Sequence, residues 1–151
     1  MPFKSILCPT DLSSMSIKAS QKAVELARIF DAKLTLLHIH EYLMDEKEMI
    51  MLRVSVKDYK EMQNKRLADV EKEMADEVAK AGGDGLNVDY LQRESNRPHK
   101  EILKVAEEID AGLIVMATNG RSGFVENVLG SNAENVVHRA KCPVLTIRVP
   151  E

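Results

Sequence analysis

The chain of 151 residues carries 21 basic and 24 acidic side chains, a formal net charge of −3 at pH 7, and 44% hydrophobic residues. This composition predicts a single globular domain over residues 1–151, and it argues against a nucleic-acid-binding protein, which would concentrate basic residues on one surface. No apolar stretch approaches the length of a membrane span and the N-terminus lacks a signal-peptide core, so the expected location is the cytoplasm.

The predicted elements alternate between strand and helix. Short apolar runs predict strands over 5–8 and 34–39, separated by a helix over 13–30 with Ile17, Val24 and Ala27 on helical spacing. A polar segment then leads into a long helix that ends near residue 80, before Gly82 and Gly83. The remaining predicted elements are strands over 87–91, 113–117 and 144–149 and helices over 98–109 and 132–139.

This alternation implies right-handed crossovers and an open, mostly parallel sheet of about five strands with helices on both faces. Ligands of such α/β sheets bind beyond the carboxyl ends of the strands, where the strand order reverses. The first and fourth strands end in the turn Pro9-Thr10-Asp11 and in a glycine-rich loop. If these two strands are neighbours, the turn and the loop face each other across one crevice.

The glycine-rich loop joins a buried-type strand to a helix that starts at Ser131. A helix N-terminus offers unpaired backbone N–H groups and the positive end of the helix dipole, which together favour a phosphate. A structural reading of the same residues stays open, with Gly120 and Gly123 as turn residues and Gly130 as a point of close helix packing. Asp11 likewise contacts a ligand or belongs to the N-cap region of the first helix.

The loop resembles the signature of the universal stress protein family, Gly-x2-Gly-x9-Gly-Ser/Thr. The segment Ala117-x2-Gly120-x9-Gly130-Ser131 has this spacing, with alanine in place of the first glycine. Segments 4–13, 36–40 and 140–147 are similar to the first, second and last strands of the family. The resemblance implies a Rossmann-like fold of the adenine nucleotide alpha hydrolase type.

The resemblance also implies an ATP site with Mg²⁺ shared among the phosphates. The residues that would border adenine and ribose are Pro9, Thr10, Asp11 and Ile39. Those along the sugar and first phosphate would be Met116, Ala117 and Gly120, and those at the outer phosphates Gly130, Ser131, Asn132 and Ala133. Arg121 is the only cation inside the loop, and it either clamps a phosphate or faces water.

No catalytic residue is assigned. The loop is neither a Walker A sequence nor a dinucleotide fingerprint, and no serine hydrolase elbow is present. Glu126 is the one carboxylate within the loop, and nothing places it beside an attacking water. The four histidines lack metal-ligand spacing, and Cys8 and Cys142 are expected to be buried, inert thiols.

The resemblance therefore implies an ATP-binding universal stress protein that acts as a sensor or signalling module in the stress response, with slow hydrolysis at most. The alternatives are a dimeric stress adaptor that binds other proteins without nucleotide, and a slow ATPase. A homodimer through the C-terminal strand is expected, because residues 144–149 alternate apolar and polar side chains and form a sheet edge.

Overall fold

The computed structural model describes residues 3–118 and 131–148, which form one sheet covered by helices. The strands are β1 (Ser5–Pro9), β2 (Lys33–His40), β3 (Val88–Glu94), β4 (Leu113–Thr118) and β5 (Val144–Arg148). The helices are α1 (Ser16–Phe30), α2 (Glu46–Met51), α3 (Val56–Lys80), α4 (Pro98–Glu108) and α5 (Ser131–Arg139). None of the helices in these two ranges has the length and apolarity needed to cross a membrane.

The sheet has five strands in the order β3-β2-β1-β4-β5, and every pairing is parallel. The predicted fold class is therefore confirmed. Strand β1 pairs with β2 on one side and with β4 on the other, so the first and fourth strands are neighbours at the point where the order reverses. Strand β5 lies at one edge, beside β4.

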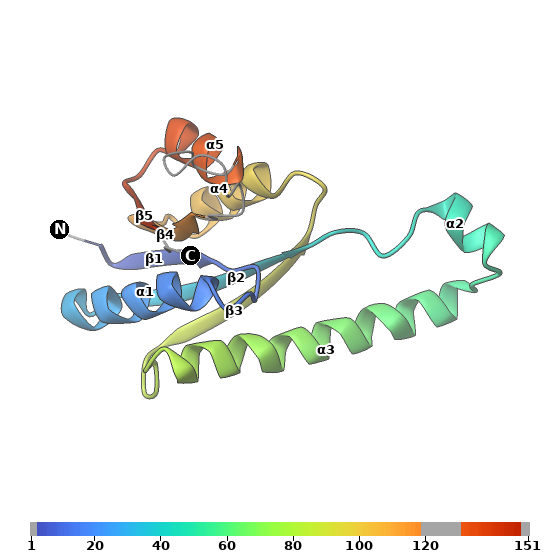
Figure 1. The fold of residues 1–151 in the computed structure, drawn as a ribbon, viewed down its shortest axis with the longest axis horizontal. Coiled ribbons are helices and arrows are strands. Elements are labelled where there is room, and N and C mark those ends of the chain that lie inside the picture. Colours follow the sequence, from blue (N-terminus) through green and yellow to red (C-terminus); the bar gives the residue numbers. More distant parts are fainter. Residues whose placement is uncertain (1–2, 119–130, 149–151) are drawn as a thin grey trace.

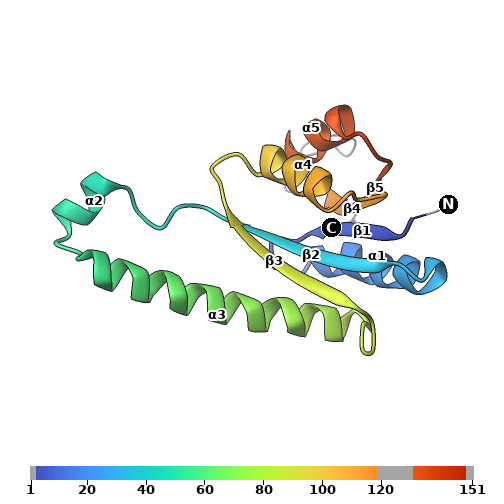
Figure 2. The ribbon, with the colours of Figure 1, turned by 180° about the vertical axis from the view of Figure 1, so that it is seen from behind.

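Two hydrophobic cores lie on opposite faces of the sheet (Figures 1 and 2). Helices α1 and α3 cover one face, where Ile6, Leu36 and Val115 are buried. Helices α4 and α5 cover the other face, where Leu7 and Ile114 are buried. Both faces of the central strands are thus shielded from water, which explains their continuous apolar runs.

Several predicted boundaries differ from the observed ones. Helix α1 begins at Ser16 rather than at residue 13, because Leu12 adopts a positive φ of 63° and the Asp11 Oδ1 atom accepts a hydrogen bond from the Ser13 N–H group. Strand β3 extends to Glu94 because its pairing with β2 continues as far as His40.

The sequence did not predict α2, a six-residue helix whose N-cap Asp45 accepts a hydrogen bond from Glu48 N–H. Helix α2 and the first part of α3 project away from the sheet as an arm (Figures 1 and 2). Of the methionines in this part of the sequence, Met74 is fully buried in the core, whereas Met51 and Met62 are exposed.

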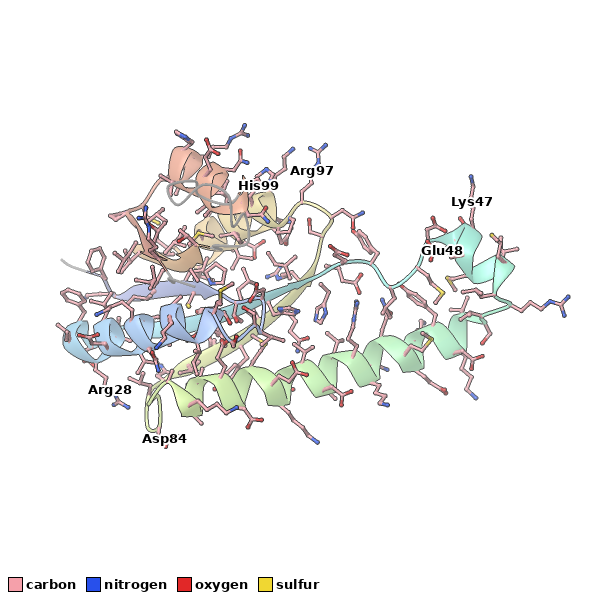
Figure 3. The ribbon with its side chains drawn as sticks, in the orientation of Figure 1. Arg28, Lys47, Glu48, Asp84, Arg97 and His99 are labelled. Atoms are coloured by element: carbon pink, nitrogen blue, oxygen red, sulfur yellow. The ribbon has the colours of Figure 1, made fainter. Side chains whose placement is uncertain are left out.

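The far end of α3 turns back into β3 through a tight loop beside α1. Figure 3 shows Arg28 of α1 next to the loop that carries Asp84, and its guanidinium donates to the carbonyl oxygens of Gly82 (2.6 Å) and Asp84 (2.9 Å). Gly83 packs closely against α3, because a Cβ atom there would lie 2.4 Å from the Val78 Cγ1 atom and 3.0 Å from the Val78 carbonyl oxygen.

We therefore expect Gly83→Ala to lower the free energy of unfolding by about 1–3 kcal/mol, because the buried, β-branched Val78 has little room to move. Gly112→Ala is the matched control, since its Cβ would meet Phe3 at an ordinary distance of 3.5 Å. Urea unfolding monitored by circular dichroism measures both variants. Equal stability of the two variants would contradict the packing argument.

Candidate functional site

A cavity of about 420 Å³ opens at the carboxyl ends of β1, β2 and β4, where the strand order reverses. This is the position at which open α/β sheets bind ligands, and the volume lies within the usual range for small-molecule sites. The predicted site residues that line the cavity are Pro9, Thr10, Asp11, Ile39, Met116, Ala117, Ser131, Asn132 and Ala133. The turn after β1 and the start of α5 therefore line one crevice, whereas most of the glycine-rich loop expected to face this turn lies outside the described residues.

Three predicted site residues, Gly120, Arg121 and Gly130, lie outside the described residues. The phosphate-loop interpretation of these positions remains a prediction from the sequence.

The cavity also has walls that the sequence analysis did not name. His38 and Leu37 of β2, Pro98 and Ile102 of α4, and Ser13, Met15 and Ser16 before and at the start of α1 all line it. The order of the elements could have identified the α4 residues. Because α4 follows the parallel strand β3, it begins at the carboxyl-end edge of the sheet, where the cavity lies. With Ile39 and buried Met116, Ile102 gives one part of the cavity an apolar lining suited to a flat ring.

The N-terminus of α5 also lines the cavity, with Ser131 and Asn132 exposed and Ala133 buried. The helix spans Ser131–Arg139, so its first N–H groups and its dipole favour an anion in the cavity. Ala117, which replaces the first glycine of the signature, lies in β4 and does not adopt a positive φ. A side-chain methyl is therefore compatible with the backbone at this position.

Thr10 lines the cavity, but its polar groups are already engaged. Its N–H group donates to the Leu37 carbonyl oxygen (2.8 Å), and its own carbonyl oxygen lies 2.9 Å from His38 Nδ1. Its hydroxyl lies 2.9 Å from the Glu77 Oε1 atom and accepts a hydrogen bond from Leu12 N–H (3.0 Å). Thr10 thus contributes a wall and a fixed backbone rather than a free hydroxyl.

Asp11 is exposed at the rim of the cavity. The alternative role as an N-cap is wrong, because α1 begins five positions later and Met15 is its N-cap residue. Instead, the Asp11 Oδ1 atom accepts from Ser13 N–H at 2.9 Å, which closes a local turn. The Asp11 carboxylate is therefore held at the rim of the cavity and does not cap a helix.

Beneath the turn, Glu77 of α3 is a buried carboxylate surrounded by hydroxyl groups. Its oxygens lie 2.9 Å from Thr10 Oγ1, 2.5 Å from Ser16 Oγ and 2.9 Å from Ser20 Oγ. Nearby Cys8 is fully buried, and burial, together with the charge of Glu77, raises the pKa of its thiol to about 12. Cys8 is therefore unreactive, as expected, whereas Cys142 is only partly buried.

His38 and His40 are hydrogen-bonded structural residues on β2. Since His38 Nδ1 lies beside the Thr10 carbonyl oxygen, this nitrogen carries the proton and donates. His40 Nε2 lies 2.6 Å from Gln92 Oε1, and the two imidazole rings meet edge to face with centroids 4.7 Å apart. Burial lowers the pKa of His40, as do the nearby His38 and Arg66, while the Gln92 hydrogen bond and Glu94 oppose this.

The chain matches known proteins over nearly its whole length. The sequence model of the Universal stress protein family matches residues 2–148. Universal stress protein MJ0531 of Methanocaldococcus jannaschii is 31% identical over 150 residues, which cover 99% of this chain and 84% of that protein. Universal stress protein YxiE of Bacillus subtilis is 31% identical over 148 residues, covering 97% of this chain and 99% of that protein.

Solved structures share the fold. The structure of MJ0577 from Methanocaldococcus jannaschii superposes with a TM-score of 0.74 at 26% identity, covering 100% of this chain and 99% of that one. A universal stress protein in complex with cAMP gives 0.71 at 22% identity, covering 98% of both chains. One from Archaeoglobus fulgidus in complex with dAMP gives 0.63 at 21%, covering 97% of this chain and 99% of that one.

The lowered pKa of His40 makes a prediction about stability. As the pH falls below 6.5, the ordinary value, the unfolded chain takes up a proton at His40 before the folded protein does, so the free energy of unfolding decreases. Above pH 6.5 the lowered pKa of His40 contributes nothing to the free energy of unfolding. We expect His40→Gln, which can still donate to Gln92, to lose less stability than the wild type between about pH 7 and pH 5.

Urea unfolding at the two pH values measures this difference. His138→Gln is the control, because His138 lies on α5 with 72% of its side chain exposed. The free energy of unfolding of this variant should change with pH as that of the wild type does. Parallel pH profiles for wild type and His40→Gln would contradict the assignment.

Proposed function

The chain belongs to the universal stress protein family, and we propose that it binds ATP with Mg²⁺ in the cavity between the β1 turn and the start of α5. In this proposal it acts in the cytoplasm as a nucleotide-dependent sensor or signalling module of the stress response. The observation that carries the proposal is the meeting of nine predicted site residues around one cavity at the reversal of strand order. Structural relatives in complex with cAMP and dAMP support an adenine nucleotide as the ligand.

The apolar part of the cavity supplies most of the binding energy in this proposal. A helix N-terminus stabilises an anion by about 0.3–1 kcal/mol, or ~2 in a sheltered geometry. Micromolar affinity requires about 8 kcal/mol, so the phosphates alone do not account for it. Adenine packed against Ile39 and Met116 would remove the apolar faces of the base from water, which contributes about 25 cal/mol per Å² of apolar surface buried.

Mg²⁺ would be held mainly through the phosphates. Over residues 3–118 and 131–148, no three His, Cys, Asp or Glu side chains form a cluster that could hold a metal ion. The cavity does offer oxygen atoms of the kind Mg²⁺ prefers, from the Asp11 carboxylate and the Ser131 hydroxyl. The ion would neutralise phosphate charge and complete its coordination with water.

Binding rather than turnover is the proposed activity. Of the described lining residues, Asp11 and His38 are the candidates for a general base. His38 donates its Nδ1 proton to the Thr10 carbonyl oxygen and keeps Nε2 as an acceptor, and Asp11 accepts from Ser13 N–H with one carboxylate oxygen. A general base also needs a water aligned with the phosphate, which neither hydrogen bond provides, so we propose slow hydrolysis at most. The alternative is an adaptor that binds no nucleotide. The alanine at position 117 does not favour it, since the backbone there has no positive φ and tolerates a methyl group.

We expect isothermal titration calorimetry to show micromolar binding of ATP with Mg²⁺ and weaker binding of GTP, because guanine presents a different edge to the β2 backbone. Ile39→Ala should weaken ATP binding about tenfold by removing apolar contact with the base. Ile29→Ala is the matched control, because Ile29 is 64% exposed on α1 and does not line the cavity. No heat with either nucleotide would favour the adaptor.

We also propose that the protein is a homodimer joined through β5. This strand is an edge of the sheet, and an unpaired edge of a sheet favours pairing with a second copy. Leu145 is exposed, while Ile147 on the same face of the strand is partly buried.

Leu145→Lys is expected to shift the protein from dimer to monomer at micromolar concentration, because the lysine would place a charge in the apolar interface. Static light scattering measures the mass. Leu52→Lys, at an exposed leucine after α2, is the control and should leave the dimer intact. A wild-type monomer at this concentration would refute the proposed dimer.

A further inference from the structure

Glu77 is a buried carboxylate that the proposed binding site does not use directly. Its exposed fraction is 7%, and among the described residues no lysine, arginine or histidine forms an ion pair with it. A buried carboxylate is unfavourable unless hydrogen bonds compensate for the loss of water. Here the compensation comes from three hydroxyl groups, those of Thr10, Ser16 and Ser20.

Two of these hydroxyl groups connect α3 to two segments that line the cavity. Thr10 lies in the turn after β1, and Ser16 is the first residue of α1; both line the cavity. In sequence they are 67 and 61 positions from Glu77, so the carboxylate connects regions that only the fold brings together. An apolar residue would fill the same space but would leave the hydroxyl groups of Thr10 and Ser16 without this shared acceptor.

The turn needs such support because its backbone is unfavourable. Leu12 adopts φ 63°, a left-handed conformation that a leucine rarely adopts. Its N–H group donates to Thr10 Oγ1 at 3.0 Å, and Thr10 Oγ1 is in turn hydrogen-bonded to Glu77 Oε1. The chain of contacts therefore runs from Glu77 through the Thr10 hydroxyl to the strained residue next to Asp11.

We infer that Glu77 is a positioning residue for the nucleotide site, one that holds the turn 9–13 in the shape that forms one wall of the cavity. The inference rests on the proposed function for its effect on nucleotide binding. Its effect on the turn itself does not depend on any ligand.

The first experiment compares ATP affinity in Glu77→Ala, Glu77→Gln and Val78→Ala by calorimetry, at a temperature where thermal melts show each variant to be folded. Glu77→Ala should bind about tenfold more weakly, because the turn loses its shared acceptor. Glu77→Gln keeps one carbonyl oxygen for Thr10 and Ser16, and should stay within about threefold of the wild type. Val78→Ala, a buried neighbour on α3 that does not line the cavity, should lose stability without losing affinity.

The second experiment needs no ligand. Amide hydrogen exchange followed by NMR should be about tenfold faster at Thr10 and Leu12 in Glu77→Ala, relative to the amide of Cys8 in β1, and unchanged in Val78→Ala. If Glu77→Ala does not fold, Glu77→Met replaces it, because methionine fills the same space without offering the Thr10 and Ser16 hydroxyls a shared acceptor.

The outcomes separate the two proposals. Wild-type protein that binds no nucleotide would refute the proposed function, and the exchange data would still decide the role of Glu77. Wild-type affinity in Glu77→Ala together with unchanged exchange at Thr10 and Leu12 would overturn the inference. An equal loss of affinity in Glu77→Gln and Glu77→Ala would also overturn it, since the carboxylate charge and not its positioning would then be required.

Discussion

The position of β1 at the centre of the sheet is the constraint on which the rest of the structure depends. This five-residue strand hydrogen-bonds to β2 along one side and to β4 along the other, and Ile6, Leu7 and Cys8 are completely buried. Alternate side chains of the strand enter opposite cores. Because the chain leaves β1 toward β2 and returns later to β4, the crossovers depart to opposite sides and a crevice opens at its carboxyl end.

The candidate site lies in that crevice. The turn after β1, the end of β4 and the start of α5 meet there, although they are far apart in the sequence. The two kinds of surface that an adenine nucleotide requires, an apolar wall and a helix N-terminus, are contributed by separate elements. The central parallel strand therefore creates the crevice, and the side chains around the end of this strand determine which ligand fits.

Buried polar groups keep this geometry fixed. Thr10 has its N–H, carbonyl and hydroxyl groups all engaged, so the backbone at the cavity has little freedom to change. Glu77 adds a carboxylate in the core between α1 and α3, where the hydroxyl groups of Ser16 and Ser20 hydrogen-bond to it. Such a network is costly if any member is unpaired, and it favours one arrangement of the turn over others. The apolar cores supply stability, whereas these hydrogen bonds supply the shape of the site.

The sequence alone determined the order of the main strands and helices, because continuous apolar runs and helical spacing are local signals. It also determined the family signature, since Ala117, Gly120, Gly130 and Ser131 have a fixed spacing along the chain. Residues whose importance depends on contacts between distant segments could not be found in this way. Glu77, His38 and Ile102 carry no local signal, and a carboxylate on a charged helix looks like any other exposed residue. The tertiary structure alone placed them, because the fold brings His38 of β2 and Ile102 of α4 to the cavity and packs α3 so that Glu77 is removed from water.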